Sequence, residues 1–140
     1  METFRIYLSG GMSGLSWDEQ TAWRKLIVKR LESFEGKYKL DIVDPTKYFN
    51  LEVKRHKTER EARNFDLYNV RRSDLIIVNF NNPLSIGTDQ EITIAAEHHI
   101  PVIGLNKDHK FLHSWSVDCC ERIFDDIDEL IEYVKEFYLL

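Results

Sequence analysis

The chain has 140 residues, 43% of them hydrophobic and 31% charged, which suits one globular domain with a sizeable core and leaves no room for a second. Its net charge of -5 argues against binding of a nucleic acid polymer, which needs clustered Lys and Arg side chains. Charged or polar residues interrupt every apolar run before it reaches the length of a membrane span or a signal peptide. We therefore expect a cytoplasmic protein without a membrane partner.

Strand patterns and helix patterns alternate along the chain. Short runs rich in β-branched and aromatic residues predict strands, and apolar positions with a period near 3.6 predict helices. The expected strands are residues 4–8, 39–43, 75–80, 101–105 and, less regular, 122–124. The expected helices are residues 17–34, a segment that follows a charged stretch from residue 51 and ends near residue 72, residues 88–99 and residues 127–138. This alternation indicates a parallel sheet covered by helices on both faces.

A glycine-rich loop follows the first predicted strand. In Gly10-Gly11-Met12-Ser13-Gly14 the missing side chains could let the backbone approach a phosphate or a sugar, and a plain tight turn is the alternative. The loop is not G-x-G-x-x-G, and no G-K-[ST] follows it. A dinucleotide site or a P-loop is therefore not expected.

The most informative segment leads from the third predicted strand through Asn, Pro and Gly into the next helix. It lies beyond the carboxyl end of a strand, where ligands collect in open α/β sheets. Glu91 is expected in the first turn of that helix, where unpaired backbone N–H groups hold a carboxylate ionised and ready to act as a nucleophile. The structural alternative is a capping box, in which Thr88 and Glu91 each satisfy a backbone N–H group.

No metal site and no cofactor are predicted. Cys119 and Cys120 are adjacent and match no metal-ligand or redox spacing, and the five histidines form no ligand set.

An ordered set of short motifs resembles the nucleoside 2-deoxyribosyltransferase family. The motifs are Tyr7-Leu8-Ser9-Gly10-Gly11, then Asp66, then Ser73-Asp74, and then Gly87-Thr88-x-x-Glu91. Each motif is modest alone, but the likeness runs in the same order over nearly the whole chain. It implies a single flavodoxin-like, doubly wound α/β domain over residues 1–140, with a mainly parallel sheet of four to five strands.

The resemblance also implies an activity. Glu91 matches the family nucleophile, which attacks the anomeric carbon of a 2-deoxyribonucleoside and forms a covalent deoxyribosyl-enzyme intermediate. Tyr7 matches a phenol that orients this carboxylate, and Asp66 matches an aspartate near the leaving base. From the residues alone, Tyr7 could equally be a packed strand residue, and Asp66 could be an ordinary solvent-facing helix residue. A base as acceptor makes the enzyme a transferase, and water makes it a hydrolase.

Ser85 departs from the transferase pattern, which has an aspartate at this position. The related 2-deoxynucleoside 5-monophosphate N-hydrolases have a serine there, and a hydroxyl beside the Gly87 N–H group suits a phosphate dianion better than a carboxylate does. Against this, Ser13 stands where the hydrolase branch has an arginine. Transferase is therefore the first prediction, the 5-monophosphate N-glycosidase is the alternative, and a nucleotide-binding module without turnover is a third reading. The expected substrate-binding residues are Gly10, Gly11, Ser85, Gly87, Thr88, Ser114 and Ser116.

The segment of residues 111–118 occupies the place from which family members reach into a neighbouring subunit. Trp115 is a residue type that anchors interfaces, and Ser114 or Ser116 could donate a hydroxyl to the substrate across the boundary. This predicts a homo-oligomer, dimeric or larger, with shared active sites. A loop folded onto its own domain is the alternative.

Overall fold

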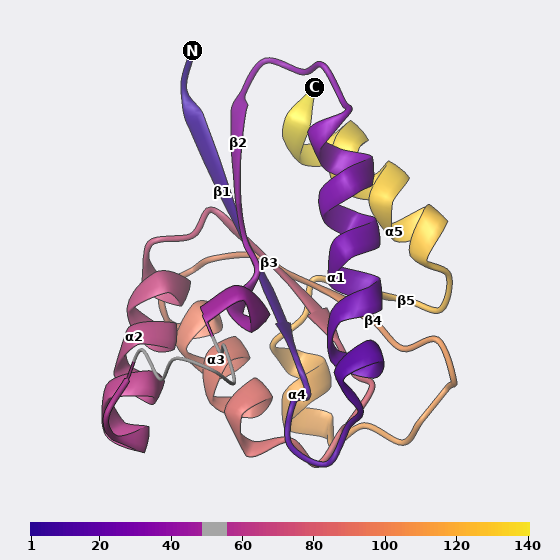
Figure 1. Ribbon diagram of the computed structural model, residues 1–140. Helices are drawn as coiled ribbons and strands as arrows, with labels where there is room; N and C mark the ends of the chain where they lie inside the picture. Colours follow the sequence, from indigo (N-terminus) through magenta and orange to yellow (C-terminus); the bar gives the residue numbers. More distant parts are fainter. Residues whose placement is uncertain (49–55) are drawn as a thin grey trace.

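The computed structural model describes residues 1–48 and 56–140 and contains a five-stranded sheet in the order β2-β1-β3-β4-β5 (Figure 1). Every neighbouring pair of strands is parallel. The strands are β1 (Thr3–Gly10), β2 (Lys39–Val43), β3 (Leu75–Asn79), β4 (Val102–Leu105) and β5 (Arg122–Phe124). The predicted doubly wound α/β fold is confirmed.

Helices cover both faces of the sheet. They are α1 (Trp17–Glu32), α2 (Glu59–Arg71), α3 (Ile86–Glu97), α4 (Ser114–Asp118) and α5 (Ile127–Val134), which continues as a π-helical turn, Lys135–Leu139. A 3₁₀ helix, Pro45–Tyr48, follows β2. In Figure 1, α1 and α5 lie on one side of the sheet, and α2 and α3 lie on the other.

The side chains of each strand divide between these two layers. Along β3, Leu75 and Ile77 belong to the core beneath α1 and α5, whereas Ile76 and Val78 belong to the core beneath α2 and α3. On β1, Leu8 joins the first core and Tyr7 joins the second. Because side chains alternate along a strand, the face that carries Tyr7 also carries the side chain two residues further on.

The ends of the predicted elements shift by a few residues. Helix α3 begins at Ile86 rather than at residue 88, and α1 ends at Glu32. The 3₁₀ helix and α4 are short and were not predicted. The first part of the predicted charged stretch, residues 51–55, lies outside the described residues.

Candidate active site

Glu91 is buried on the sheet side of α3, with 9% of its surface exposed. The Tyr7 hydroxyl donates a short hydrogen bond to its Oε2, and the Ser9 hydroxyl donates one to its Oε1 at 2.7 Å. Tyr7 and Ser9 are two residues apart on β1, so both side chains leave the same face of the strand. The two oxygens of the carboxylate are therefore each held by one hydroxyl from the same strand.

The start of α3 differs from the prediction in a way that changes the role of Glu91. The N-cap is Ser85, whose hydroxyl oxygen accepts hydrogen bonds from the Thr88 N–H group at 3.3 Å and from the Thr88 hydroxyl at 2.9 Å. The acidic residue of the first turn is Asp89. The predicted capping box of Thr88 and Glu91 is therefore wrong, and so is the placement of Glu91 in the first turn. Glu91 lies beyond the first turn of α3, and its side chain is buried.

Burial sets the ionisation of Glu91. Loss of hydration raises its pKa from the ordinary 4.5 to about 7, and the nearby Asp66 adds to this rise. The hydrogen bonds from Tyr7 and Ser9 and the charge of Arg24 lower this pKa and only partly offset burial. The expectation that helix N–H groups hold Glu91 ionised is thus wrong. Two hydroxyls stabilise the carboxylate instead, and its pKa lies near neutral pH.

Asp66 lies on α2 and is the second acid of the site. Burial raises its pKa to about 6, and Arg24 opposes that rise. Its Oδ1 is buried and has no hydrogen-bond partner within the described parts of the chain. Burial, with Glu91 second, also raises the pKa of Tyr7 well above its ordinary value. The structure therefore brings Tyr7, Asp66 and Glu91 together from three separate elements, and the charge of Asp66 raises the pKa of Glu91.

Two of the glycines expected to bind substrate, Gly10 and Gly11, are closely packed against neighbouring side chains. A side chain at Gly10 would lie 2.7 Å from the Trp23 ring, and one at Gly11 would lie 2.8 Å from Asn82. The Gly11 N–H group donates a hydrogen bond to a side-chain oxygen of Asn81 at 3.0 Å. Gly87 is exposed in the first turn of α3, with open space around its Cα. Contacts of these glycines with substrate stay predictions.

The α4 segment folds onto its own chain. The Ser116 hydroxyl donates a hydrogen bond to Asp89 Oδ1 on α3 at 3.0 Å, while Ser114 is exposed at the start of α4. The Trp115 side chain points to solvent, with 78% of its surface exposed. One hydroxyl of the segment is thus committed within the chain, and the Trp115 indole meets the His113 ring edge-on but stays mostly exposed.

The sequence analysis gave no role to two residues of this region. Ser9 holds Glu91, and its place two positions after Tyr7 on a strand is a signal that could have identified it. Arg24 is completely buried although it lies on a helix that carries many charges. No local pattern distinguishes it from a solvated arginine, because burial of a charge depends on partners from other elements.

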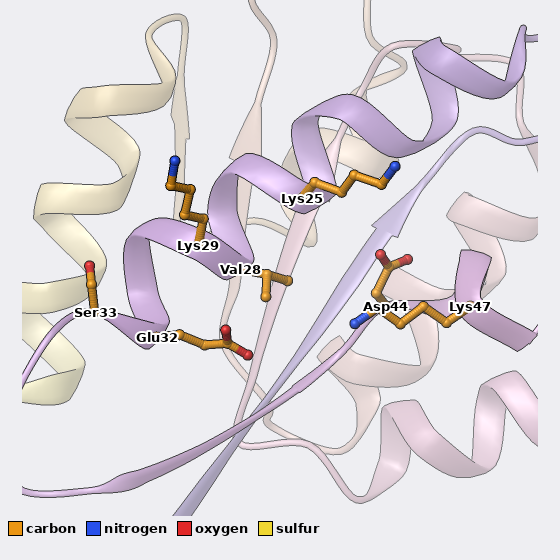
Figure 2. A pocket seen from close by; sticks show the side chains of 7 residues that line it. All are labelled: Lys25, Val28, Lys29, Glu32, Ser33, Asp44 and Lys47. Carbon is orange, nitrogen blue, oxygen red and sulfur yellow. The ribbon is translucent and has the colours of Figure 1, made fainter.

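A cavity of about 410 Å³ lies between α1 and the segment of Asp44 and Lys47 that follows β2 (Figure 2). Its lining is mostly charged and includes three lysines and two acids: Lys25, Val28, Lys29, Glu32, Ser33, Asp44 and Lys47.

The described residues contain no group of three or more His, Cys, Asp or Glu side chains that could hold a metal ion. None of the helices in residues 1–48 and 56–140 combines the length and the apolarity needed to cross a bilayer.

Comparison with solved structures extends over nearly the whole chain. A 2-deoxyribosyltransferase from Bacillus psychrosaccharolyticus is similar with a TM-score of 0.73 and 16% identity over 92% of this chain and 91% of that one. A 2-deoxyribosyltransferase from Leishmania mexicana has a TM-score of 0.68 and 18% identity, with 97% and 99% covered. A CMP N-glycosidase from Clostridium botulinum has a TM-score of 0.60 and 17% identity, with 95% and 99% covered.

These similarities establish the fold, which is the one shared by the solved deoxyribosyltransferase structures and the N-glycosidase. The predicted resemblance to that family is confirmed at the level of fold. No protein-family model and no curated protein matches the chain.

Proposed function

We propose that this protein is an enzyme that cleaves the N-glycosidic bond of a 2-deoxyribonucleoside, with Glu91 as the nucleophile, and transfers the sugar to a second base. The observation that carries the proposal is the clamp on Glu91: Tyr7 and Ser9 each donate a hydrogen bond to one carboxylate oxygen in a buried setting. Such a carboxylate has a defined orientation and little hydration to lose before it attacks. The likeness in fold to the two deoxyribosyltransferases supports the same activity.

The reaction follows from two displacements at the anomeric carbon. A Glu91 oxygen attacks that carbon and forms an ester, while the carbon–nitrogen bond breaks and its electron pair leaves with the base. Asp66 in its protonated form supplies the proton that the base nitrogen takes up. Burial raises the pKa of Asp66 to about 6, so this form is more available than in an ordinary aspartate. A nitrogen of the acceptor base then attacks the same carbon, and the ester bond to Glu91 breaks. Asp66 takes up the proton that the acceptor nitrogen loses, and the starting configuration is restored.

A 5-monophosphate N-glycosidase is the second candidate. Its specific support is the Ser85 hydroxyl at the start of α3, where the helix dipole favours a phosphate dianion. The likeness in fold to the CMP N-glycosidase agrees with this candidate. Here water takes the place of the acceptor base in the second displacement.

Exposed apolar side chains support an association that completes the site. They gather at the start of α3 and in the segment that leads into α4, and comprise Leu84, Ile86, Phe111 and Trp115. Exposed apolar side chains of this kind are typical of interfaces, and a symmetric homo-oligomer would bury them. We infer that neighbouring subunits meet here.

One experiment separates the candidates. The protein is incubated with deoxynucleosides and with deoxynucleoside monophosphates, each with and without a free acceptor base, and base release and exchange are followed by chromatography. Exchange that needs the acceptor indicates a transferase, and release into water from monophosphates indicates the N-glycosidase. Trapping of a sugar ester on Glu91, seen by mass spectrometry and absent from Glu91→Gln, identifies the nucleophile. Tight binding of the nucleotides without release or exchange would refute both enzymes and leave a binding module.

A further inference from the structure

The edge of the sheet beside the candidate site ends earlier than β1 does. The pairing of β1 with β2 runs from Thr3↔Lys39 to Tyr7↔Val43, while β1 continues to Gly10 and stays paired with β3 on its other side. After Asp44 the chain turns into a 3₁₀ helix that begins at Pro45, and proline has no N–H group to continue a ladder. Among the described residues, no strand therefore pairs with the last three residues of β1 on the β2 side.

Two carbonyl groups of β1 face that missing strand. The Glu2 carbonyl accepts a hydrogen bond from Lys39 of β2, whereas the Arg5 carbonyl accepts one from Asp74, next to β3. Because backbone groups alternate in direction along a strand, the even-numbered carbonyls point toward β2. The carbonyls of Leu8 and Gly10 thus point to the side where β2 has already turned away.

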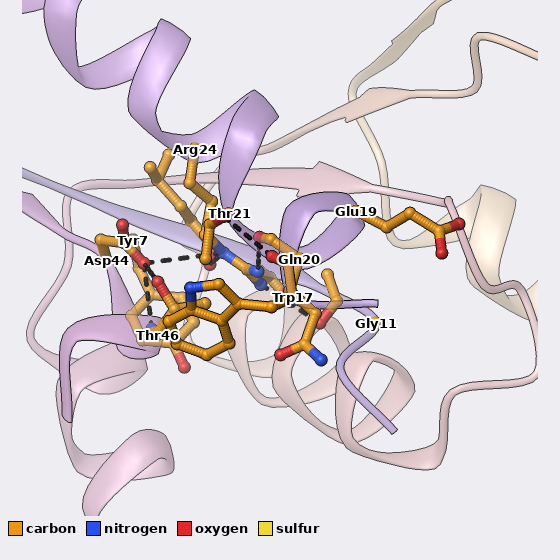
Figure 3. Close-up of polar contacts among 12 residues, drawn as sticks. Tyr7, Gly11, Trp17, Glu19, Gln20, Thr21, Arg24, Asp44 and Thr46 are labelled. Atoms are coloured by element: carbon orange, nitrogen blue, oxygen red, sulfur yellow. Dashed lines mark hydrogen bonds and ion pairs between the residues drawn. The ribbon is translucent and has the colours of Figure 1, made fainter. Parts of the chain in front are cut away.

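The guanidinium of Arg24 occupies the place beside these two carbonyls that a longer β2 would take (Figure 3). Its Nε donates a hydrogen bond to the Leu8 carbonyl and its Nη2 donates one to the Gly10 carbonyl, each at 3.2 Å. Its Nη1 donates to the Gln20 carbonyl of α1 at 2.6 Å, and Asp44 Oδ1 lies 3.9 Å from Nε. Arg24 has no exposed surface, so these contacts replace all of its water.

Leu8 and Gly10 enclose Ser9 in the sequence, and Tyr7 precedes them. Tyr7 and Ser9 are the two residues whose hydroxyls hold Glu91. We propose that Arg24 is a positioning residue of the candidate active site: it substitutes for β2 beside the end of β1 and so fixes the strand that presents Tyr7 and Ser9 to Glu91. The kinetic part of this inference rests on the proposed function, and the structural part does not.

The charge of Arg24 acts on the same site. The titratable groups that face it come from four elements or their ends: Tyr7 on β1, Asp44 after β2, Asp66 on α2 and Glu91 on α3. Among the residues that the structure describes, Arg24 is the only buried lysine or arginine. Its charge lowers the pKa of both Asp66 and Glu91. Loss of this charge should therefore raise the pKa of Glu91 and move the acid limb of the activity profile to higher pH.

Three variants test the proposal. Arg24→Lys keeps the charge but cannot bond both carbonyls with the fixed spacing of a guanidinium. Arg24→Met with Asp44→Asn removes the charge without leaving a buried carboxylate unpaired. Lys25→Met is the matched control, because it removes a positive charge from the neighbouring, exposed position on α1. The measurements are kcat and KM for base release or exchange, and the titration of the Glu91 carboxyl by carbon NMR, assigned with Glu91→Gln.

We expect kcat of the Arg24→Met, Asp44→Asn protein to fall on the order of 10²-fold with little change in KM, because the nucleophile is displaced and the bound substrate is not. The titration midpoint of Glu91 should move to higher pH in the double variant. In Arg24→Lys this midpoint should stay in place, and only kcat should fall. Lys25→Met should match the wild type in both measurements.

A folded Arg24→Lys with unchanged kcat, or a folded double variant with an unchanged Glu91 midpoint, would overturn the proposal. If the double variant does not fold, Arg24→Lys decides the question by itself. If the wild type neither releases nor exchanges a base, the proposed function fails, and the Glu91 titration still decides the role of Arg24, since it needs no substrate.

Discussion

Replacement of Glu91 by glutamine should stabilise the protein above neutral pH while it abolishes activity. The pKa of Glu91 is about 7 in the folded protein against an ordinary 4.5, so ionisation of the buried group costs about 3 kcal/mol at 1.36 kcal/mol per pKa unit. Between these two values the folded protein keeps a proton that the unfolded chain has lost. The free energy of unfolding of the wild type therefore falls as the pH rises from about 4.5, and the loss is complete above about 7.

Glutamine has no such proton, so Glu91→Gln avoids this loss. Near pH 4.5 the two proteins should differ by no more than about 1 kcal/mol, the value of one rearranged hydrogen bond. Near pH 8 the variant should be more stable by about 3 kcal/mol. Urea unfolding at a series of pH values measures this difference, and base release should fall by at least about 10³-fold.

Glu97→Gln is the matched control, because it makes the same chemical change at an exposed position on α3. Its stability should follow the wild-type curve at every pH. The reasoning is refuted if Glu91→Gln and the wild type keep a constant difference from pH 4.5 to 8, because Glu91 would then titrate alike in the folded and unfolded states.

Three further changes test the roles proposed for Tyr7, Ser85 and Trp115. Tyr7→Phe removes a hydrogen bond that lowers the pKa of Glu91, so kcat should fall about 10- to 100-fold and the acid limb of the pH profile should move upward; an unmoved limb would contradict the contact as a source of carboxylate stabilisation. Ser85→Asp should weaken the use of deoxynucleoside monophosphates by like-charge repulsion and spare unphosphorylated nucleosides, and equal kinetic effects on both would remove Ser85 from a phosphate site. Trp115→Ser should shift sedimentation toward smaller species and lower activity together, whereas a fully active wild-type monomer at high dilution would show that each site is built from one chain.

Much of the architecture could be read from the sequence because its signals are local. The bounds of β2 and β5 agree with the prediction, since turn residues and alternating side chains mark short strands within a few positions. The ends of α3 were less certain, because Ser85 and Thr88 are both suitable N-caps and only the completed helix shows that Ser85 takes the role. The resemblance in motifs also predicted Tyr7, Asp66 and Glu91 as catalytic residues before their geometry was known.

Only the tertiary structure determines how Tyr7, Asp66 and Glu91 interact. Tyr7 and Glu91 are 84 positions apart, and their contact depends on the packing of α3 against the face of β1 that carries Tyr7. The raised pKa of Glu91 depends on burial, which is a property of the surrounding layers and not of the local sequence. Arg24 is buried because β2 stops before β1 and leaves two carbonyls that need a donor. Periodicity and turn chemistry act over a few residues, whereas burial and charge pairing are settled only when separate elements meet.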